Sequence, residues 1–334
     1  MLDQGYCLRL STDDDAAAIC ALMQRAFDYG DGSNAALNLA WWRWKYRQNP
    51  EGCYSIVCEG PEGRLLGHYG GVPSRVRVDG RELTFGQNCD SCTDPEVRRG
   101  LRNPGMFVRL AQAYASSFSG FENNALMYGL PIRSAHRIGS RYLDYWLLRS
   151  QLGLVLEGDV ALPPGDERVV VEPVGEPSVD HDEFARAAQQ GFRCHGSRSR
   201  AFLNWRFVDH PHVRYQLAEA RSGASGALRG CAAYRSARFR GRDFGLLMDV
   251  FAMPGDAAAV LALVRWAAAR AARDGMSAVF FLTTPALPWF GLLQQWGFRA
   301  QTTDYVLAAR PYAAIDPAFL RAHWTYTLAD FDIL

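Results

Sequence analysis

The sequence predicts an α/β (α+β) fold made of two units in tandem, each a mixed, mostly antiparallel sheet flanked by helices. Three observations lead to this prediction. Short alternating apolar segments recur along both halves of the 334-residue chain. In each half, one long connection between strands contains a helix, which allows that pair of strands to be parallel. A Trp-Arg element at 41–44 also returns at 204–207, at the corresponding place of the second half, which supports a structural duplication.

The first half carries the clearer pattern. Acidic residues at 13–15 suit the start of a helix, where the backbone dipole favours negative charge. Asp79-Gly80 is typical of a tight hairpin turn. Together with the apolar spacing, these signals predict, in order, a strand at 7–10, helices at 13–27 and 37–46, strands at 54–59, 65–72, 75–78, 83–85 and 87–93, a helix at 106–117, a strand at 125–130 and a short helix at 134–139.

The segment 158–180 differs from both halves, because prolines stand there among acidic residues, as in a linker with an edge strand. We therefore expect an N-terminal domain at 1–155, a linker at 156–180 and a C-terminal domain at 181–334. In the C-terminal domain the pattern predicts helices at 184–190, 256–273 and 288–296, a Trp-bearing segment at 199–208, and strands at 215–220, 230–236, 244–251 and 278–282.

The composition argues against several classes of protein. A formal net charge of +1 does not fit a nucleic-acid-binding surface, and no apolar run is long enough to cross a membrane. Neither a secretory leader nor a paired set of metal ligands is predicted, since the Cys-x-x-Cys of Cys89 and Cys92 has no second pair. Free thiols indicate a reducing, cytoplasmic location. Lys45 is the only lysine, which we attribute to codon bias of a GC-rich genome.

The most informative stretch is a loop before the helix predicted at 106–117. A helix N-terminus has unpaired backbone N–H groups and a positive dipole end, and a glycine-containing loop lets the backbone close around a phosphate. The loop supplies charge and bare backbone through Arg98, Arg99, Gly100, Arg102, Gly105 and Met106. It therefore suits a pyrophosphate, although a solvated basic turn is the alternative.

The run Asp94-Pro95-Glu96-Val97-Arg98-Arg99-Gly100, followed by Gly105-Met106-Phe107, resembles the coenzyme A loop of the GNAT (GCN5-related N-acetyltransferase) superfamily. The segments 128–131 and 137–139 resemble that family's next strand and short helix. The resemblance covers about 5–150 and, more loosely, 183–310. The loop departs from the family by the inserted residues 101–104, and Ser140 stands where the family often has Phe. The second half has 253–256, Met-Pro-Gly-Asp, and no Arg-Arg-Gly, so we expect no coenzyme A there.

The resemblance implies two tandem GNAT-like units, with acetyl-CoA or another acyl-CoA as cofactor of the first. It implies that Ser91, Cys92 and Thr93 pair with the pantetheine arm. The phosphates would be held by the loop and helix start, namely Arg98, Arg99, Gly100, Arg102, Gly105, Met106 and Phe107.

The acid-base candidates are Asp90, His136 and His68. Each has an alternative reading: Asp90 as a strand-end cap, and the two histidines as surface or structural residues. Cys92 is a rival covalent nucleophile or a small buried residue. The tryptophans at 41, 42 and 44 would line an acceptor pocket or belong to the core, and Tyr128 is expected in the core or a pocket wall.

The resemblance favours an acyl-CoA-dependent N-acyltransferase, with acetyl as the expected acyl group, acting on a small-molecule amine such as an amino sugar, amino acid or natural-product intermediate. Two other hypotheses stay open. One is a non-catalytic acyl-CoA-binding or sensor protein. The other is an acyltransferase that takes its acyl group from an acyl carrier protein, which would require a basic docking face near Arg98, Arg99 and Arg102, because carrier proteins are acidic. We expect a monomer or homodimer, without nucleic-acid or membrane partners.

Overall fold

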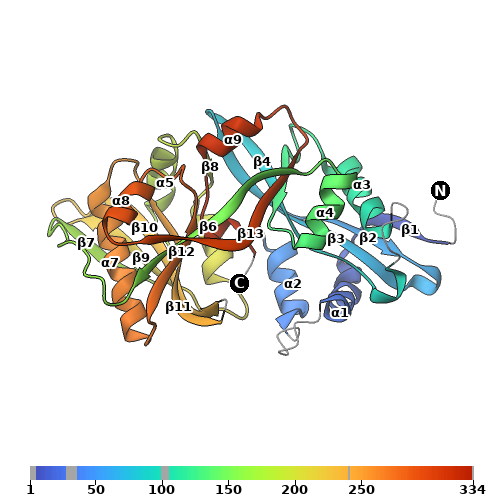
Figure 1. Cartoon of the computed structure of the whole chain (residues 1–334), viewed down its shortest axis with the longest axis horizontal. Helices are drawn as coiled ribbons and strands as arrows, with labels where there is room; N and C mark the ends of the chain where they lie inside the picture. Colours follow the sequence, from blue (N-terminus) through green and yellow to red (C-terminus); the bar gives the residue numbers. More distant parts are fainter. Residues whose placement is uncertain (1–4, 28–35, 99–104, 240, 333–334) are drawn as a thin grey trace. The chain divides into compact units, whose positions relative to one another are not determined.

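The computed structural model describes residues 5–27, 36–98, 105–239 and 241–332 (Figure 1). The chain divides into two compact units, each assembled from separate stretches of sequence. Unit 1 comprises Met1–Arg75, Leu83–Arg149 and Tyr305–Ile315, and unit 2 comprises Val76–Glu82, Ser150–Asp304 and Asp316–Leu334. The contiguous boundaries expected from the sequence stay a prediction, and the structure adds that 305–315 pack with unit 1.

The sheet of unit 1 has the strand order β1-β2-β3-β4-β5-β13. These strands are β1 (Cys7–Leu10), β2 (Tyr54–Glu59), β3 (Leu65–Val78), β4 (Arg81–Thr93), β5 (Leu126–Gly129) and β13 (Arg299–Pro311). The pairs β1–β2, β2–β3 and β5–β13 are antiparallel, whereas β4 and β5 are parallel, as the predicted crossover requires. The predicted breaks at 73–74 and at residue 86 were wrong, because β3 and β4 each run through as one strand.

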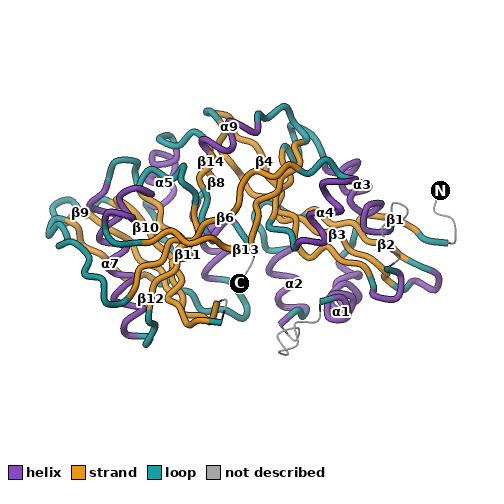
Figure 2. Tube along the Cα trace, in the orientation of Figure 1, coloured by secondary structure: helices purple, strands orange, loops and turns teal. Residues whose placement is uncertain are grey.

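Helices cover both faces of this sheet. They are α1 (Ala16–Ala26), α2 (Leu39–Tyr46), α3 (Met106–Phe118) and α4 (Arg133–Tyr142). Neighbouring residues of β3 show the arrangement: the ring of Tyr69 lies 5.1 Å from Tyr114 of α3, and the ring of His68 lies 5.8 Å from Tyr46 of α2. Because successive side chains of a strand point to opposite faces, α2 and α3 lie on opposite sides of the sheet (Figure 2).

Unit 2 repeats this layout with the strand order β6-β12-β11-β10-β9-β7. The strands are β6 (Trp146–Glu157), β7 (Val169–Val174), β9 (Gln216–Ser222), β10 (Leu228–Phe239), β11 (Arg242–Ala252) and β12 (Ala278–Thr283), with the short parallel pair β8 (Cys194–Gly196) and β14 (Trp324–Thr325) beside them. Its helices are α5 (His181–Gln189), α6 (Arg200–Leu203), α7 (Ala257–Arg273), α8 (Phe290–Gln295) and α9 (Pro317–His323). Strands β11 and β12 are parallel and α7 connects them, as α3 connects β4 and β5.

The predicted arrangement is confirmed: the chain forms two units, each with a mixed, mostly antiparallel run of strands and flanking helices. Among the residues described, no helix combines the length and apolar character that a membrane span requires.

Candidate functional site

Strands β4 and β5 are paired over a short stretch and then diverge. The parallel register joins Phe85 to Leu126 and, at its other end, Gln87 to Tyr128. Among the described residues no β4–β5 pair follows Gln87 and Tyr128, although β4 continues to Thr93. A strand edge without a partner presents backbone N–H and C=O groups to whatever lies beside it. The diverging ends therefore offer hydrogen bonds to an extended ligand.

A cleft of about 490 Å³ opens between these diverging ends. The expected cofactor-binding residues that the structure describes all line it, namely Ser91, Cys92, Thr93, Arg98, Gly105, Met106 and Phe107. Arg99, Gly100 and Arg102 lie outside the described residues. The roles of these residues stay predictions, but the structure brings the described ones to one cavity.

Helix α4 forms a wall of the cleft that the sequence did not reveal. Ser134, Ala135, Ile138 and Tyr142 line the cleft, together with Ile132 just before the helix. Positions 134, 135, 138 and 142 share one face of a helix because they follow its three-to-four-residue period. The periodicity was present in the sequence, but which face meets a ligand depends on how the helix docks, and the sequence carried no signal for that.

The N-terminus of α3 lies at the same cleft. Gly105 is the N-cap residue and supplies no side-chain cap. The first backbone N–H groups of a helix have no intrahelical acceptor, and Met106 and Phe107 both line the cleft. The positive end of the helix dipole is therefore available to an anion such as a phosphate.

Arg98 binds backbone rather than pointing freely into the cleft. Its guanidinium donates to the carbonyl of Thr93, at 3.0 Å from Nη2 and 3.2 Å from Nε, and to the carbonyl of Ala26 at 3.0 Å. Asp94, which is 1% exposed, accepts hydrogen bonds from Arg25 and Arg64. These contacts fasten the end of β4 to its surroundings, so Arg98 shapes the mouth of the cleft as well as bringing charge to it.

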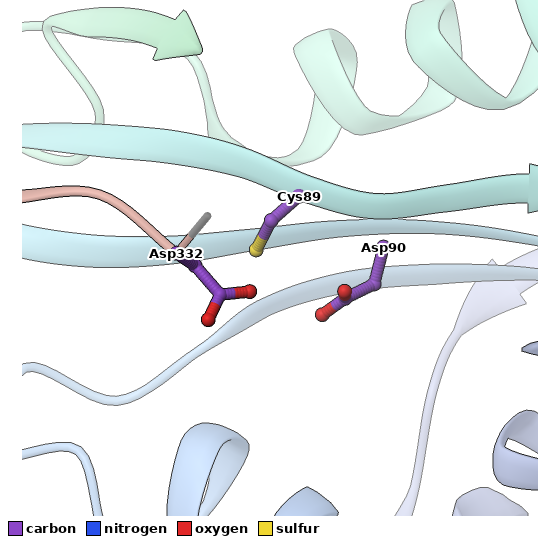
Figure 3. Close-up of side chains that lie close together, drawn as sticks. All are labelled: Cys89, Asp90 and Asp332. Atoms are coloured by element: carbon purple, nitrogen blue, oxygen red, sulfur yellow. The ribbon is translucent and has the colours of Figure 1, made fainter. Parts of the chain in front are cut away.

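Asp90 sits at an irregular point of β4. Its φ of 53° lies in the left-handed region, which Asp tolerates better than most residues. Cys89 and Asp90 both contact the Tyr46 hydroxyl, with 3.9 Å from Oη to Cys89 Sγ and 2.6 Å to Asp90 Oδ2. In a regular strand these neighbours would point to opposite faces. The irregular backbone therefore turns both side chains to the same side of β4 (Figure 3), where they meet Tyr46 of α2, and neither Cys89 nor Asp90 is among the residues that line the cleft.

Lys45 is a site residue that the sequence analysis missed. Its Nζ lies 2.5 Å from Asp90 Oδ2, and its side chain is 1% exposed. It also lies 4.6 Å from the centre of the Trp41 ring. A buried ammonium is tolerated when it is paired with an opposite charge, and an aromatic face adds attraction. The only signal in the sequence is that a single lysine stands in an arginine-rich chain, and codon bias explains that observation equally well.

His68 is fully buried and both of its ring nitrogens have partners. Nδ1 donates to the carbonyl of Asp90 at 2.8 Å, because a carbonyl can only accept, and Nε2 lies 2.9 Å from Ser55 Oγ. Burial lowers the pKa of His68, so the ring is neutral near pH 7. This geometry favours a structural role, in which His68 holds the irregular backbone of β4.

His136 lies on α4 but is not among the residues that line the cleft. Its Nε2 is 3.4 Å from Ser140 Oγ, one turn further along the helix. The cleft-facing positions 135, 138 and 142 place His136 on a different face. Its predicted role as an acid is untested, and the orientation of α4 does not favour it.

Burial decides between the alternatives for several other residues. Cys92 is 5% exposed, and burial raises the pKa of its thiol to about 12. A thiol protonated at neutral pH is a poor nucleophile, so the reading as a small wall residue is favoured. The tryptophans at 41, 42 and 44 and Tyr128 are all buried, which favours core packing for the tryptophans. Tyr128 also lines a small cavity described below.

Solved structures with the same fold are similar to almost the whole chain. A conserved protein of Enterococcus faecalis V583, a probable N-acyltransferase, matches with a TM-score of 0.64 and 12% identity, over 92% of this chain and 73% of that one. A GCN5-related N-acetyltransferase of Anabaena variabilis matches with a TM-score of 0.63 and 13% identity, over 92% and 73%. N-myristoyltransferase of Saccharomyces cerevisiae with bound myristoyl-CoA matches with a TM-score of 0.57 and 12% identity, over 92% and 79%.

These matches confirm, at the level of the fold, the resemblance to the GNAT superfamily. By sequence, no family model matches the chain, and no curated protein matches it either.

Proposed function

We propose that this protein is an N-acyltransferase that moves an acyl group from the thioester of an acyl-CoA to a small-molecule amine. The observation that carries the proposal is the cleft of unit 1, where the end of β4, which has separated from β5, and the N-terminus of α3 meet in one cavity. The strand edge suits the amide-containing pantetheine arm and the helix start suits the pyrophosphate. The similar structures include acyltransferases, one of them with bound myristoyl-CoA.

The reaction is a direct attack of the amine nitrogen on the thioester carbonyl. The ammonium group first loses one proton to a base, and the neutral amine then attacks. The C–S bond breaks as the C–N bond forms, and the departing thiolate takes up the second N–H proton, so that the products are an amide and a free thiol. A thiol has an ordinary pKa near 8.5, so a thiolate leaves without strong acid assistance. Backbone N–H groups of the irregular β4 segment would stabilise the oxyanion, an interaction that contributes roughly 3 kcal/mol in comparable sites.

Asp90 is our candidate base. Lys45 and the Tyr46 hydroxyl fix the position of its carboxylate, and His68 fixes its backbone carbonyl. Asp90 does not itself line the cleft, but the residues that follow it, Ser91 to Thr93, do. Its fixed carboxylate therefore stands beside the strand end along which the thioester would lie, where it is suited to accept a proton from the approaching amine. In this scheme Lys45, Tyr46 and His68 are positioning residues.

The test separates binding from chemistry. Wild type and Asp90→Asn are incubated with acetyl-CoA and an amine library; released thiol is measured, products are identified by mass spectrometry, and CoA binding is measured by calorimetry. We expect Asp90→Asn to bind CoA within a few-fold of wild type and to turn over roughly 10² to 10⁴ times more slowly. Binding without turnover in wild type would favour the non-catalytic sensor, and absence of any CoA binding would overturn the proposal.

A carrier-protein donor is the second candidate, because α4 has an exposed basic row beside the cleft. Arg133, Arg137 and Arg141 follow one another at four-residue spacing and are exposed, while other positions of the same helix line the cleft. Acyl carrier proteins are acidic, so this row has complementary charge. Arg137→Glu would then abolish transfer from an acyl carrier protein and leave the affinity for acyl-CoA unchanged; a donor that is free CoA predicts no loss of transfer.

A further inference from the structure

A second, smaller cavity lies where β4 and β5 stop pairing. It has a volume of about 60 Å³. Asn88 and Gly129, the residues directly after the last recorded pair Gln87 and Tyr128, both line it. The large cleft is lined by residues further along the same two segments, such as Ser91 and Ile132. The small cavity is therefore at the apex of the diverging strands, and the cleft is further out.

The inner end of this apex cavity is closed by a buried cluster. Tyr145 and Met127 line the cavity. The hydroxyl of Tyr145 lies 2.6 Å from that of Tyr69, and the hydroxyls of Tyr69 and Tyr312 donate to Met127 Sδ at 3.6 and 3.7 Å. Met127 is 2% exposed and Tyr69 is fully buried. Because these buried side chains are hydrogen-bonded to one another, a longer ligand group could enter the cavity only if several of them moved together.

Tyr145 is also fixed from behind by α4. A Cβ atom on Gly139 would lie 2.1 Å from the Tyr145 ring, so the ring packs directly against the glycine backbone. The backbone N–H of Tyr145 donates to the carbonyl of Gly139 at 3.3 Å. Burial raises the pKa of Tyr145 to about 12, so its hydroxyl stays neutral and keeps its hydrogen bond with Tyr69. The closed end of the apex cavity is thus formed by side chains that are held both by one another and by α4.

The order of the two cavities indicates which part of a donor each one holds. The N-terminus of α3 is at the outer cleft, so the pyrophosphate belongs there and the thioester end of the pantetheine arm extends toward the apex. We propose that the apex cavity is the acyl pocket and that it restricts the donor to short acyl groups, acetyl or propionyl, with Met127 and Tyr145 as the residues that set the limit. This inference rests on the proposed function and specifies its donor.

The volume supports a limit of two or three carbons. An engineered apolar cavity of roughly 150 Å³ in another protein holds benzene, which corresponds to about 25 Å³ for each carbon. On that scale a cavity of about 60 Å³ holds between two and three carbons. Each further methylene would have to displace a packed side chain, and in a hydrophobic pocket one methylene changes binding about 10- to 200-fold.

The test is a series of dissociation constants measured by calorimetry with the full-length protein, using CoA, acetyl-, propionyl-, butyryl-, hexanoyl- and myristoyl-CoA. We expect acetyl- and propionyl-CoA to bind at least as tightly as CoA. Butyryl-CoA should bind about 10-fold more weakly, and hexanoyl- and myristoyl-CoA more weakly still. Equal or tighter binding of hexanoyl- or myristoyl-CoA would overturn the inference and leave the proposed function standing. Failure of every CoA species to bind would overturn both.

A matched pair of variants assigns the limit to the cavity. Met127→Ala removes the side chain at the closed end and should restore butyryl-CoA binding to within about 2-fold of propionyl-CoA. Leu126→Ala is the control, because Leu126 is also fully buried on β5 but points to the opposite face. Leu126→Ala should keep the wild-type order of affinities for the acyl-CoA series. If both variants shift the order equally, the limit lies elsewhere and the assignment to Met127 fails; if Met127→Ala does not fold, the wild-type series still decides the inference.

Discussion

The two units build the same parallel pair of strands and connecting helix, but they use the space between them differently. In unit 1 the divergence of β4 and β5 opens into a cleft. In unit 2 the recorded pairing of β11 and β12 ends at Leu246 and Phe280, and the chain's own C-terminal segment lies against the strand ends. Thr327 Oγ1 donates to Asp249 of β11 at 2.7 Å, and Thr283 of β12 donates to the carbonyl of Tyr326 at 3.1 Å.

A buried ion cluster completes the closure of unit 2. Arg198 has a side chain with 0% exposure and pairs with Asp249 and Asp330, each at 2.6 Å. A guanidinium between two carboxylates satisfies the charges that burial would otherwise make costly. Unit 2 thus has buried side chains of its own at the strand ends, where unit 1 has a cleft.

The two connecting helices also begin differently. Asp256 caps α7, with its carboxylate accepting from the N–H of Ala259, whereas Gly105 supplies no side-chain cap to α3. A carboxylate therefore already occupies the anion position in unit 2, and that position is left for a ligand in unit 1. The comparison teaches that this backbone layout does not itself create a cofactor site. The residues that enter the divergence and the cap of the helix decide it, and on these grounds we infer that unit 1 alone binds CoA.

The largest effect should come from breaking the ion cluster. Arg198→Met leaves Asp249 and Asp330 buried without their cation, and we expect the free energy of unfolding to fall by about 3 to 5 kcal/mol in urea titrations. Arg168→Met is the control. Arg168 pairs with Asp166 at the surface, and exposed ion pairs contribute little to the free energy of unfolding. Unchanged stability of Arg198→Met would contradict the view that unit 2 is closed by this cluster.

Lowering the pH should reduce the stability of unit 2, because His195 is buried there. Burial, followed by the charge of Arg198, lowers the pKa of His195 to about 3, against an unfolded value near 6.5. The folded state keeps the ring neutral while the unfolded state takes up a proton, so stability is complete above pH 6.5 and falls as the pH decreases below it. Between pH 7 and pH 5 this residue should cost about 2 kcal/mol.

His195→Phe checks that expectation, since His195 stacks with Phe192 and Phe251 and an aromatic ring fits there. Urea titrations at pH 7 and pH 5 should show a smaller loss of stability for the variant than for wild type. An identical loss in both proteins would mean that His195 takes up no proton on unfolding.

The helix cap can be exchanged to make unit 1 resemble unit 2. Gly105→Asp should raise the stability by a few tenths of a kcal/mol, because Asp is a slightly better N-cap than Gly. It should also weaken CoA binding about 10-fold or more, because a carboxylate then stands where a phosphate would bind. Gly105→Asn is the matched neutral cap, expected to gain the same stability with a smaller loss of affinity. Equal affinities of the two variants in calorimetry would contradict an anion site at this helix.

The smallest effect is expected at His136. Because other positions of α4 face the cleft, His136→Ala should change both CoA affinity and turnover by less than about 2-fold. A large loss of turnover with unchanged affinity would instead support the acid role expected from the sequence.

Local signals in the sequence were sufficient for the crossover and for the start of α3 at Met106, since turn residues and apolar spacing act over a few positions. They were not sufficient where contacts between residues far apart in the sequence determine the structure. The apolar pattern ended one strand at 72 and began the next at 75, but β3 runs through this point as one strand, and the carbonyl of Pro73 accepts from Asn49 Nδ2 at 3.1 Å. No pattern in the sequence indicates that Lys45 pairs with Asp90. Which face of α4 carries His136 depends on how the helix packs against the sheet. The closure of unit 2 by its C-terminal segment was also invisible to local patterns.

The number of CoA molecules bound by one chain tests the central claim most directly. Titration calorimetry of the wild type with CoA should give one site per chain, and Ala135→Trp, which fills the cleft of unit 1, should abolish binding without loss of secondary structure. Two sites per chain, or binding that survives Ala135→Trp unchanged, would contradict the assignment of the cofactor to the cleft between β4, α3 and α4.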